Sequence, residues 1–326
     1  MKVLVTGGAG FVGSHVVDAL LEAGHDVVVV DNLSTGSMDN LNCDATFYEV
    51  DICDAESLNT VIARERPEVV NHHAAHTSVV ASVRDPMYDA RENILGSLNL
   101  LQACVTHGVK KFIYISTGGA IYGEPEYLPA DEAHPINPCS PYGVSKHTVE
   151  HYLPIFWKSL GLPFVTLRYP NVYGPRQDPG GEAGVVAIFT HQLLAGEAPT
   201  IFGDGTKTRD YLYVDDVVRA NLLVMDPDLV NKSYNLGWGR EVSDLEVFLA
   251  VKEALHSSIE PDFGQKRPGE LDRICLDATA AARDLGWRPQ VDLAEGVAQT
   301  TQFIQERLAA EPKVPRKLAR GGGKRP

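Results

Sequence analysis

A glycine-rich loop at the very start of the chain constrains the fold more than any other feature. The segment 3–13, VLVTGGAGFVG, places Gly7, Gly10 and Gly13 three residues apart, between a β-branched run and a stretch of helical character. The first glycine permits a tight turn, the second lets the backbone approach a pyrophosphate, and the third lets a helix pack close to the strand. N–H groups at the start of that helix would then bind phosphates, so the loop predicts dinucleotide binding rather than a plain turn. The predicted cofactor contacts in this loop also include Phe11 and Val12.

The rest of the first half alternates short β-branched runs with longer helical segments. Buried parallel strands are predicted at Val3–Val5, Val27–Val30, Thr46–Val50, Val69–Asn71, Phe112–Ser116 and Phe164–Arg168. Helices are predicted at Ser14–Ala23, Leu58–Arg64, Tyr88–His107 and Tyr142–Leu160. This order indicates an α/β fold with a doubly wound parallel (Rossmann) sheet, in which ligands bind at the carboxyl ends of the strands.

The pattern changes after about residue 170, where glycine and proline become dense and the segments become shorter. We expect a Rossmann domain formed by residues 1–170 plus about 208–237, and a smaller substrate-binding domain formed by residues 171–207 plus about 238–312. A final helix is expected from Asp292 to about Leu308, with Asp292 and Glu295 as a capping box. Residues 313–326 carry six basic and no acidic residues, and they are predicted to be a disordered tail.

Composition argues against several classes of function. The formal net charge of -14 disfavours nucleic acid as the main partner. No apolar run approaches the roughly 20 residues that span a bilayer, and the N-terminus lacks the layout of a signal peptide, so a cytoplasmic location is expected. Five scattered cysteines without a CxxC pair indicate free thiols and no metal site. His72, His73 and His76 are expected to make packing contacts and local hydrogen bonds.

Two aspartates at strand ends favour NAD as the dinucleotide. Asp31 ends the second predicted strand, where a carboxylate accepts hydrogen bonds from the adenosine ribose hydroxyls and would repel a 2′-phosphate. Asn32 follows it, and no arginine lies in 32–36 to favour NADP. Asp51 and Ile52 follow the third predicted strand. Asp51 would accept a hydrogen bond from the adenine amino group, and Ile52 would pack against the adenine ring. The alternative for Asp51 is the N-cap of the next helix.

A tyrosine and a lysine four residues apart provide the predicted acid–base chemistry. Ser140 can cap a helix and Pro141 suits its first turn, so Tyr142 and Lys146 would share one helix face. A neighbouring ammonium and the positive charge of an oxidised nicotinamide would lower the phenol pKa from about 10 toward about 7. The lysine would also reach the nicotinamide ribose. A tyrosine and a lysine at this spacing could also be a surface pair. Because the pair follows a dinucleotide-binding loop in this chain, the catalytic interpretation is favoured.

With these motifs the chain resembles the extended short-chain dehydrogenases, and most closely the UDP-glucose (UDP-galactose) 4-epimerases. The resemblance runs from Met1 to about Leu308 and includes TGGAGFVG, DNLSTG, ENILGSLNLL, STGGAIYG, SPYGVSK, LRYPNVYGPRQ, FGDGTKTRDYLYVDDV, YNLGWG and RPGE. It implies NAD as the cofactor and a UDP-sugar as the substrate. It also implies a homodimer formed through the predicted helices Tyr88–His107 and Tyr142–Leu160.

The resemblance also implies roles for individual residues. On the cofactor side, Ala74 and Ala75 would line the site, Asn93 would lie beside the nicotinamide half, and Tyr169 would lie near the nicotinamide. On the substrate side, Asn171 would bind a phosphate, Arg209 and Arg267 would clamp the diphosphate, and Glu270 would hold the uridine ribose. Guanidinium groups suit phosphate oxygens. For each arginine the alternative is a surface ion pair.

The sequence departs from this family at Gly118, where a serine or threonine usually assists proton transfer from the sugar 4-hydroxyl. Thr117 is the candidate substitute, because Gly118 and Gly119 would let the strand end bend toward the sugar, and Ser116 is adjacent. The alternative is that Tyr142 acts alone. Related dehydratases tend to carry acidic residues in this segment, and their absence here favours epimerisation over elimination.

The expected function is therefore NAD-dependent 4-epimerisation of UDP-glucose and UDP-galactose through a transient 4-keto sugar, as in galactose metabolism. One alternative is a 4-epimerase of UDP-N-acetylglucosamine or UDP-glucuronate, because Ile274 occupies the position of a gate residue beside the sugar and is smaller than tyrosine. A second alternative is a non-catalytic NAD-binding protein of the same fold. A third is a net oxidoreductase that releases NADH.

Overall fold

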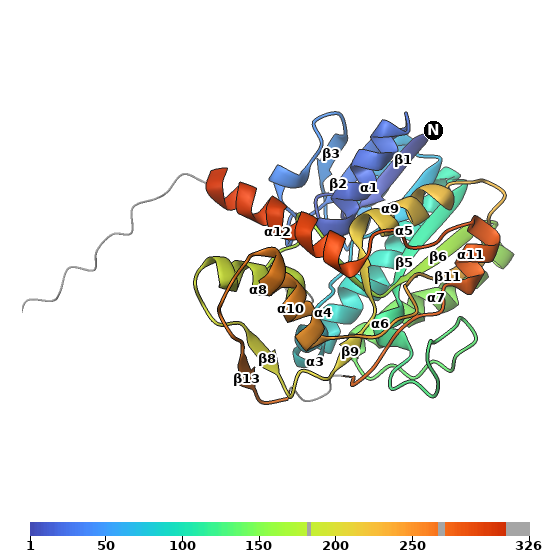
Figure 1. Ribbon diagram of the computed structural model, residues 1–326. Coiled ribbons are helices and arrows are strands. Elements are labelled where there is room, and N and C mark those ends of the chain that lie inside the picture. Colours follow the sequence, from blue (N-terminus) through green and yellow to red (C-terminus); the bar gives the residue numbers. More distant parts are fainter. Residues whose placement is uncertain (181–183, 267–270, 311–326) are drawn as a thin grey trace, which may run out of the picture.

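The computed structural model describes residues 1–180, 184–266 and 271–310, and a seven-stranded sheet forms its centre (Figure 1). The strands are β1 (Lys2–Thr6), β2 (Asp26–Asp31), β3 (Thr46–Glu49), β4 (Val69–His72), β5 (Lys111–Thr117), β6 (Phe164–Tyr169) and β11 (Lys232–Asn235). Their spatial order is β11-β6-β5-β4-β1-β2-β3, and all neighbours are parallel. The predicted doubly wound α/β fold is confirmed. The order reverses between β1 and β4, which makes their carboxyl ends a switch point for ligand binding.

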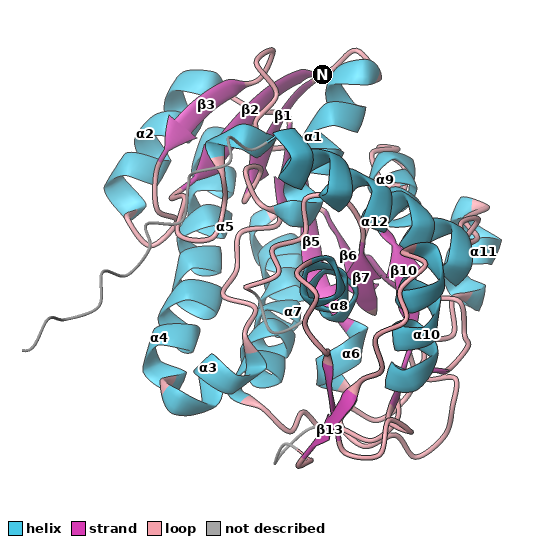
Figure 2. Ribbon diagram, turned by 60° about the vertical axis from the view of Figure 1, so that its left-hand side comes forward, coloured by secondary structure: helices cyan, strands magenta, loops and turns pink. Residues whose placement is uncertain are grey.

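Helices cover both faces of the sheet because its central strands are apolar on both sides (Figure 2). In β1, Val3 and Val5 belong to one buried core while Leu4 belongs to the other, as the alternation of side chains along a strand requires. Helices α1 (Phe11–Glu22) and α9 (Val214–Leu223) cover the first core. Helices α2 (Ala55–Glu65), α5 (Gly96–His107) and α7 (Pro141–Leu160) cover the second.

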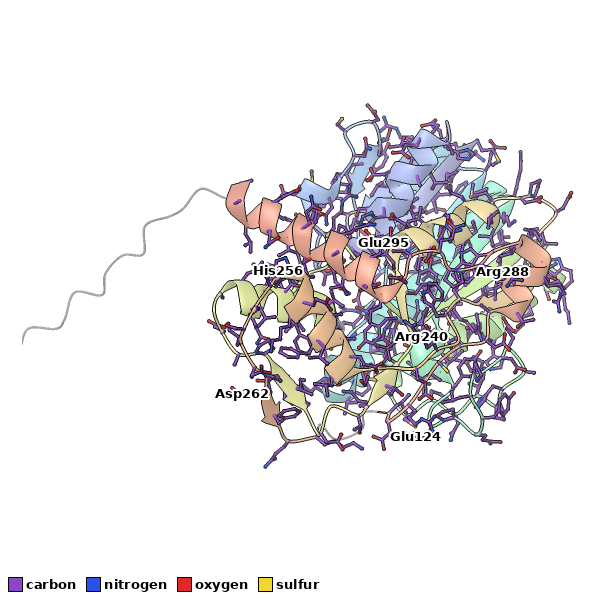
Figure 3. The ribbon with its side chains drawn as sticks, in the orientation of Figure 1. Glu124, Arg240, His256, Asp262, Arg288 and Glu295 are labelled. Carbon is purple, nitrogen blue, oxygen red and sulfur yellow. The ribbon has the colours of Figure 1, made fainter. Side chains whose placement is uncertain are left out.

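A smaller layer follows β6 and lies beside the carboxyl edge of the sheet. Its helices α8 (Val185–Leu194), α10 (Asp244–Ala254) and α12 (Leu293–Ala310) pack against one another, with Phe189 and Phe248 in edge-to-face contact at 6.0 Å. Three two-stranded sheets accompany them: β7 (Asn171–Tyr173) with β10 (Tyr211–Tyr213), β9 (Thr208–Arg209) with β12 (Val242–Ser243), and β8 (Thr200–Phe202) with β13 (Asp262–Gly264). In Figure 3, Asp262 and Glu295 mark β13 and α12 within this layer. The exact domain division stays a prediction.

The predicted helix Tyr88–His107 is interrupted in the structure. It consists of α4 (Pro86–Ala90), a π-helical turn η2 (Arg91–Leu95) and α5. Among the elements that were not predicted are the short helices η1 (Met38–Asn40), α3 (Val79–Arg84), α6 (Gly118–Ile121) and α11 (Thr279–Leu285), and also α8, α10, β8 and β13 of the smaller layer. Short helices like these carry too few residues for a periodic apolar pattern. The six strands predicted in the first half are confirmed.

The start of α12 supports half of the predicted capping box. The Asp292 carboxylate accepts the backbone N–H of Glu295 at 2.9 Å, whereas the Glu295 carboxylate accepts from the Gln299 side chain at 3.2 Å. Across the described residues, the structure contains no helix with the length and apolar character needed to cross a membrane.

Asp216 ties the smaller layer to the sheet domain from inside α9. Its carboxylate is 1% exposed and accepts the backbone N–H groups of Gln290 and Val291 at 3.0 and 3.1 Å. Its own backbone carbonyl accepts from the indole nitrogen of Trp287 at 2.9 Å, and that ring is fully buried. One residue therefore satisfies the polar groups of the chain segment that leads into α12.

We expect Asp216→Ala to lower the free energy of unfolding by about 1–3 kcal/mol, because the substitution leaves buried N–H groups without an acceptor. Chemical denaturation with and without the substitution measures the difference. Asp228→Ala, at an exposed position, should change the stability by less than about 0.5 kcal/mol. Equal stability of both variants would contradict this account of Asp216.

Candidate active site

The glycine loop brings three backbone segments into very close contact. A Cβ atom at Gly13 would lie 2.1 Å from the carbonyl oxygen of Gly7, and one at Gly7 would lie 2.6 Å from the backbone nitrogen of Ala74. Gly7 also has a φ of +71°, which L side chains rarely adopt. Helix α1 begins at Phe11 with no side-chain cap, so its first N–H groups remain for an anionic ligand. The loop therefore has the backbone geometry that a dinucleotide pyrophosphate requires.

The acidic strand ends lie beside this loop. Asp31 accepts the backbone N–H groups of Ala9 and Leu33 at 3.0 and 2.8 Å, so its carboxylate is held at the end of β2. Asn32 donates from its side chain to Asp51 at 3.1 Å, which links the ends of β2 and β3. The cap of α2 is Asp54, not Asp51, so the helix-cap alternative for Asp51 is wrong.

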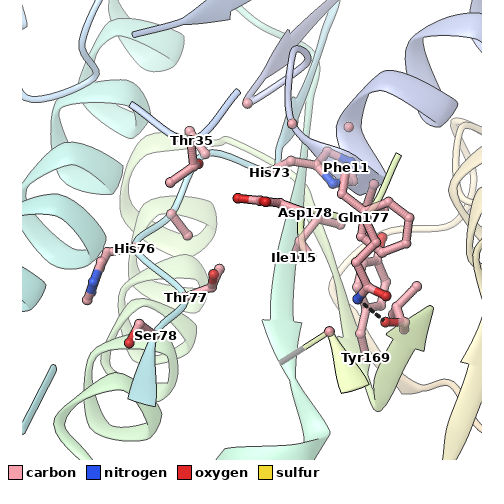
Figure 4. Close-up of a pocket in the computed structure, with 18 of the residues that line it drawn as sticks. Phe11, Thr35, His73, His76, Thr77, Ser78, Ile115, Tyr169, Gln177 and Asp178 are labelled. Atoms are coloured by element: carbon pink, nitrogen blue, oxygen red, sulfur yellow. Dashed lines mark hydrogen bonds between the residues drawn. The ribbon is translucent and has the colours of Figure 1, made fainter. Parts of the chain in front are cut away.

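One cavity of about 1190 Å³ runs along the carboxyl edge of the sheet (Figure 4). It is lined by most of the residues selected from the sequence: Gly7, Gly10, Phe11, Val12, Gly13, Asp31, Asn32, Ile52, Ala74, Ala75, Ser116, Thr117, Tyr142, Lys146, Tyr169, Asn171 and Arg209. Asp51 and Asn93 are not among its lining residues. Arg267 and Glu270 lie outside the residues that the structure describes. Figure 4 shows Phe11, Thr35, His76 and Tyr169 around the cavity, each from a different segment.

The tyrosine and lysine lie at the start of α7, as the spacing predicted. Ser140 accepts the backbone N–H of Gly143 and caps the helix. Lys146 is 4% exposed, with its ammonium 4.7 Å from the centre of the Tyr114 ring. Burial lowers the pKa of Lys146 to about 8, and the nearby carboxylates of Glu150 and Asp89 oppose that shift. The ammonium is thus held in a desolvated place at the cavity wall.

The protein groups alone do not favour the phenolate of Tyr142. Burial raises the pKa of this phenol to about 12, while Thr117 acts in the opposite direction. Desolvation of the phenolate therefore outweighs the other contributions of the protein. The predicted lowering of the pKa also invokes the positive charge of an oxidised nicotinamide, and it stays a prediction.

The structure brings Thr117, rather than position 118, to Tyr142. Thr117 is the last residue of β5 and pairs in register with Tyr169. A Cβ atom at Gly118 would lie 2.3 Å from a methyl carbon of Leu276, so a serine there would displace a buried leucine. The Ser116 hydroxyl is buried and has no hydrogen-bond partner among the described residues. Burial raises the pKa of the nearby Glu150 carboxyl, but contacts led by His147 and Arg168 outweigh burial and lower the pKa to about 2.

Asn93 lies in the π-helical turn and connects the cavity loop to the catalytic helix. Its side-chain nitrogen donates to the carbonyl of His76 at 2.9 Å, to Asp89 at 3.0 Å and to Ser145 at 3.2 Å. Its side-chain oxygen accepts the backbone N–H of His76 at 2.8 Å. π-Turns are frequent at functional sites. Here the turn places one buried amide between the β4–α3 loop and α7.

Two of the three histidines near the end of β4, His72 and His76, have the predicted local partners, whereas the Nε2 atom of His73 is buried without a hydrogen-bond partner in the described residues. His72 is buried between the hydroxyls of Thr6 and Ser97, at 2.7 and 2.9 Å. The ring of His76 lies 3.2 Å from the carboxylate of Asp89, a buried group that sequence reasoning did not identify. No periodic or spacing signal connects residues 76 and 89, because α3 lies between them in the chain.

The substrate side of the cavity contains Asn171 and Arg209. The guanidinium of Arg209 donates to the carbonyl oxygens of Thr208 and Leu271, both at 2.7 Å. It is therefore bonded to backbone, and the surface ion pair considered for it does not form in the described residues. Ile274, the expected gate position, is 2% exposed and packs in a separate core with Ile121 and Leu276. It is absent from the cavity lining.

Sequence reasoning missed the part of the lining that comes from the smaller layer. It includes Arg176 and Gln177 after β7, and Phe303 and Arg307 on α12. Arg176 pairs with Asp18 of α1 at 2.7 Å. The GPRQ stretch and the apolar face of α12 were visible in the sequence, but neither shows which side of the cavity these residues reach.

Comparison with known proteins places these features in a family. Residues 3–237 match the model of the NAD dependent epimerase/dehydratase family. A UDP-glucose 4-epimerase of Mycolicibacterium smegmatis is 46% identical over 94% of this chain and 99% of that protein. The solved structure of UDP-glucose 4-epimerase with UDP-glucose from Thermotoga maritima has a TM-score of 0.93 and 51% identity, covering 94% of this chain and all (100%) of that one. The UDP-glucose 4-epimerase complex with NAD from Thermus thermophilus has a TM-score of 0.89 and 45% identity, covering 94% and 99%.

These relatives match about 94% of the chain, and the two solved structures share its fold. The matched residues 3–237 contain the loop, the strand-end aspartates and the Tyr142–Lys146 pair. This chain belongs to the NAD dependent epimerase/dehydratase family.

Proposed function

We propose that this chain is an NAD-dependent UDP-glucose 4-epimerase, which interconverts UDP-glucose and UDP-galactose through a transient 4-keto sugar. The observation that carries the proposal is that Thr117, Tyr142 and Lys146 line the same cavity as the glycine loop. The names of the similar proteins from Mycolicibacterium smegmatis and Thermotoga maritima agree with this activity.

The residues present fit NAD as the cofactor. The close approach at Gly7 and Gly13 leaves no room for a side chain, and the uncapped start of α1 offers N–H groups to a diphosphate. Asp31 is placed to accept the adenosine ribose hydroxyls, with Asn32 beside it. Bound NAD would supply a reversible hydride acceptor for C4 of the sugar.

The proton chemistry is assigned to Tyr142 and Thr117. Tyr142 would take the proton of the sugar 4-hydroxyl, directly or through the Thr117 hydroxyl, and return it after the sugar has turned. Lys146 would bind the nicotinamide ribose. Because burial raises the pKa of Tyr142 to about 12 in the protein alone, the positive charge of the oxidised nicotinamide must stabilise the phenolate. Ser116 is assigned no proton transfer.

The other site assignments also remain part of the proposal. Ile52, Ala74, Ala75 and Tyr169 line the cavity and would contact the cofactor, whereas Asp51 and Asn93 would act from just behind the wall. On the substrate side, Asn171, Arg209, Arg267 and Glu270 would hold the UDP group. The guanidinium N–H groups of Arg209 would have to be shared between phosphate oxygens and the carbonyl oxygens of Thr208 and Leu271.

We also propose that the protein acts as a homodimer. Helices α3, α4 and α7 pack side by side and present exposed apolar side chains. These include Val83 of α3, Met87 of α4, and Val144 and Ile155 of α7, and Leu95 of the adjoining turn η2 is also exposed. Several exposed apolar side chains on neighbouring elements favour a protein interface. Leu95, Val144 and Ile155 lie on the two predicted helices through which the family resemblance implies dimer formation. The cytoplasmic location stays a prediction.

The substrate assignment is tested by adding UDP-glucose, UDP-N-acetylglucosamine and UDP-glucuronate separately to the purified protein and resolving the products. We expect UDP-galactose from the first sugar and no net NADH. If only UDP-N-acetylglucosamine or only UDP-glucuronate is converted, that sugar nucleotide is the substrate in place of UDP-glucose. Steady release of NADH would indicate a net oxidoreductase, and no conversion of any sugar would indicate a binding protein.

Tyr142→Phe should lower turnover by roughly 10²–10⁴-fold, the range for loss of a general acid–base group. Bound NAD should be retained, because the glycine loop is unchanged. Tyr127→Phe is the matched control, since that phenol is exposed and donates to Asp131 at the surface. Near-normal turnover in Tyr142→Phe would remove this residue from the mechanism.

Thr117→Val should lower turnover by roughly tenfold or more, the cost of a hydrogen bond to a charged group, whereas Thr117→Ser should retain most activity. The hydrogen bond from Thr117 lowers the Tyr142 pKa, so its loss should move the acidic limb of the pH–rate profile to higher pH. A profile unchanged by Thr117→Val would show that Tyr142 acts alone. Adding Gly118→Ser to Thr117→Val should not restore activity, because Leu276 occupies that space.

A further inference from the structure

Helix α12 brings side chains from the end of the described chain to the cofactor cavity. Phe303, Ile304, Arg307 and Leu308 line the same cavity as the glycine loop. Figure 1 shows α12 running between α8 and the end of the sheet formed by β2 and β3. This helix has no part in the catalytic scheme above, and it supplies one cation to the cavity wall.

Two sets of contacts place the guanidinium of Arg307 above the phosphate-binding loop. It lies 3.4 Å from the carboxylate of Asp39 in the turn η1. On either side of Asp39, the backbone N–H of Ser37 and the side chain of Asn40 both donate to the carbonyl of Ala9, at 3.0 and 3.1 Å. Ala9 belongs to the glycine loop itself, so a short chain of contacts joins Arg307 to the site of the cofactor diphosphate.

Asp39 is a weak partner for this cation. Its side chain is 80% exposed and that of Arg307 is 43% exposed, and exposed ion pairs contribute little to stability. The other described arginines of the cavity wall have closer partners. Arg176 pairs with Asp18 at 2.7 Å, although its Nη1 has no hydrogen-bond partner in the described part of the chain, and Arg209 is bonded to backbone carbonyls. Among these three arginines, Arg307 has the longest and most exposed ion pair.

We propose that Arg307 binds the diphosphate of NAD from the side opposite the start of α1. The inference rests on NAD being the cofactor of the proposed function. An arginine fork donates two hydrogen bonds to phosphate oxygens, and such charge-assisted bonds are stronger than neutral ones. Asp39 holds the guanidinium over the loop, and the phosphate oxygens replace Asp39 as its main partner.

The test measures the release of NAD from the holoenzyme into an enzymatic trap for free NAD, with no sugar present. Arg307→Gln should accelerate release by roughly tenfold to a hundredfold, the loss expected for hydrogen bonds to a charged group. Arg307→Lys keeps the positive charge but lacks the two-pronged guanidinium. Its rate of NAD release should lie between those of the unsubstituted protein and Arg307→Gln. Arg283→Gln, an exposed arginine on α11, is the matched control and should release NAD at the unsubstituted rate. Unchanged release in Arg307→Gln overturns the proposal.

Asp39→Asn distinguishes two roles for Arg307. Arg307 either binds the diphosphate, or it only holds α12 against the loop through its ion pair with Asp39. If Arg307 binds the diphosphate, removing the competing carboxylate should leave NAD release unchanged or slow it. If the ion pair only clasps α12 against the loop, Asp39→Asn and Arg307→Gln should accelerate release equally. That second result overturns the proposal.

A UDP-sugar also carries a diphosphate, so UDP affinity is measured by calorimetry in the same variants. Arg307→Gln should bind UDP as the unsubstituted protein does. Weaker UDP binding with unchanged NAD release would assign Arg307 to the substrate and overturn the inference. Neither measurement depends on turnover, so a wrong substrate assignment leaves this test intact.

Discussion

The close backbone contact inside the glycine loop is the constraint on which the rest of the site depends. Only a hydrogen atom fits between Gly13 and the Gly7 carbonyl, and between Gly7 and the Ala74 nitrogen. The start of α1 is therefore packed directly against the ends of β1 and β4, at the point where the strand order reverses. Because N–H groups of the backbone would hold the phosphates, this part of the site depends on chain geometry more than on any side chain.

Tyr142 lines the same cavity. Burial raises the pKa of its phenol to about 12, which disfavours the phenolate. If Tyr142 removes the sugar proton as proposed, a bound oxidised nicotinamide would supply a positive charge that offsets this cost. A reduced nicotinamide would not supply that charge.

The sequence predicts those features that lie within one strand, one loop or one helical turn. The central strands were found because they are apolar on both faces and rich in valine. The Tyr142–Lys146 pair was found because residues four apart share one helix face. The strand-end position of Asp31 follows from the second valine run. These features need no information about residues far away in the chain.

Contacts between distant segments account for the rest. Position 118 has no room for a side chain because Leu276, more than 150 positions later in the sequence, fills the space beside Gly118. The side chain of Asn93 is bonded to three separate elements through a π-turn that no apolar period reveals. Arg307 reaches the glycine loop only because α12 folds back across α8. In each case the residue type was visible in the sequence, but its partner is set by packing of the smaller layer on the carboxyl edge of the sheet. That layer therefore determines which polar groups reach the ligands, while the sheet determines where the ligands lie.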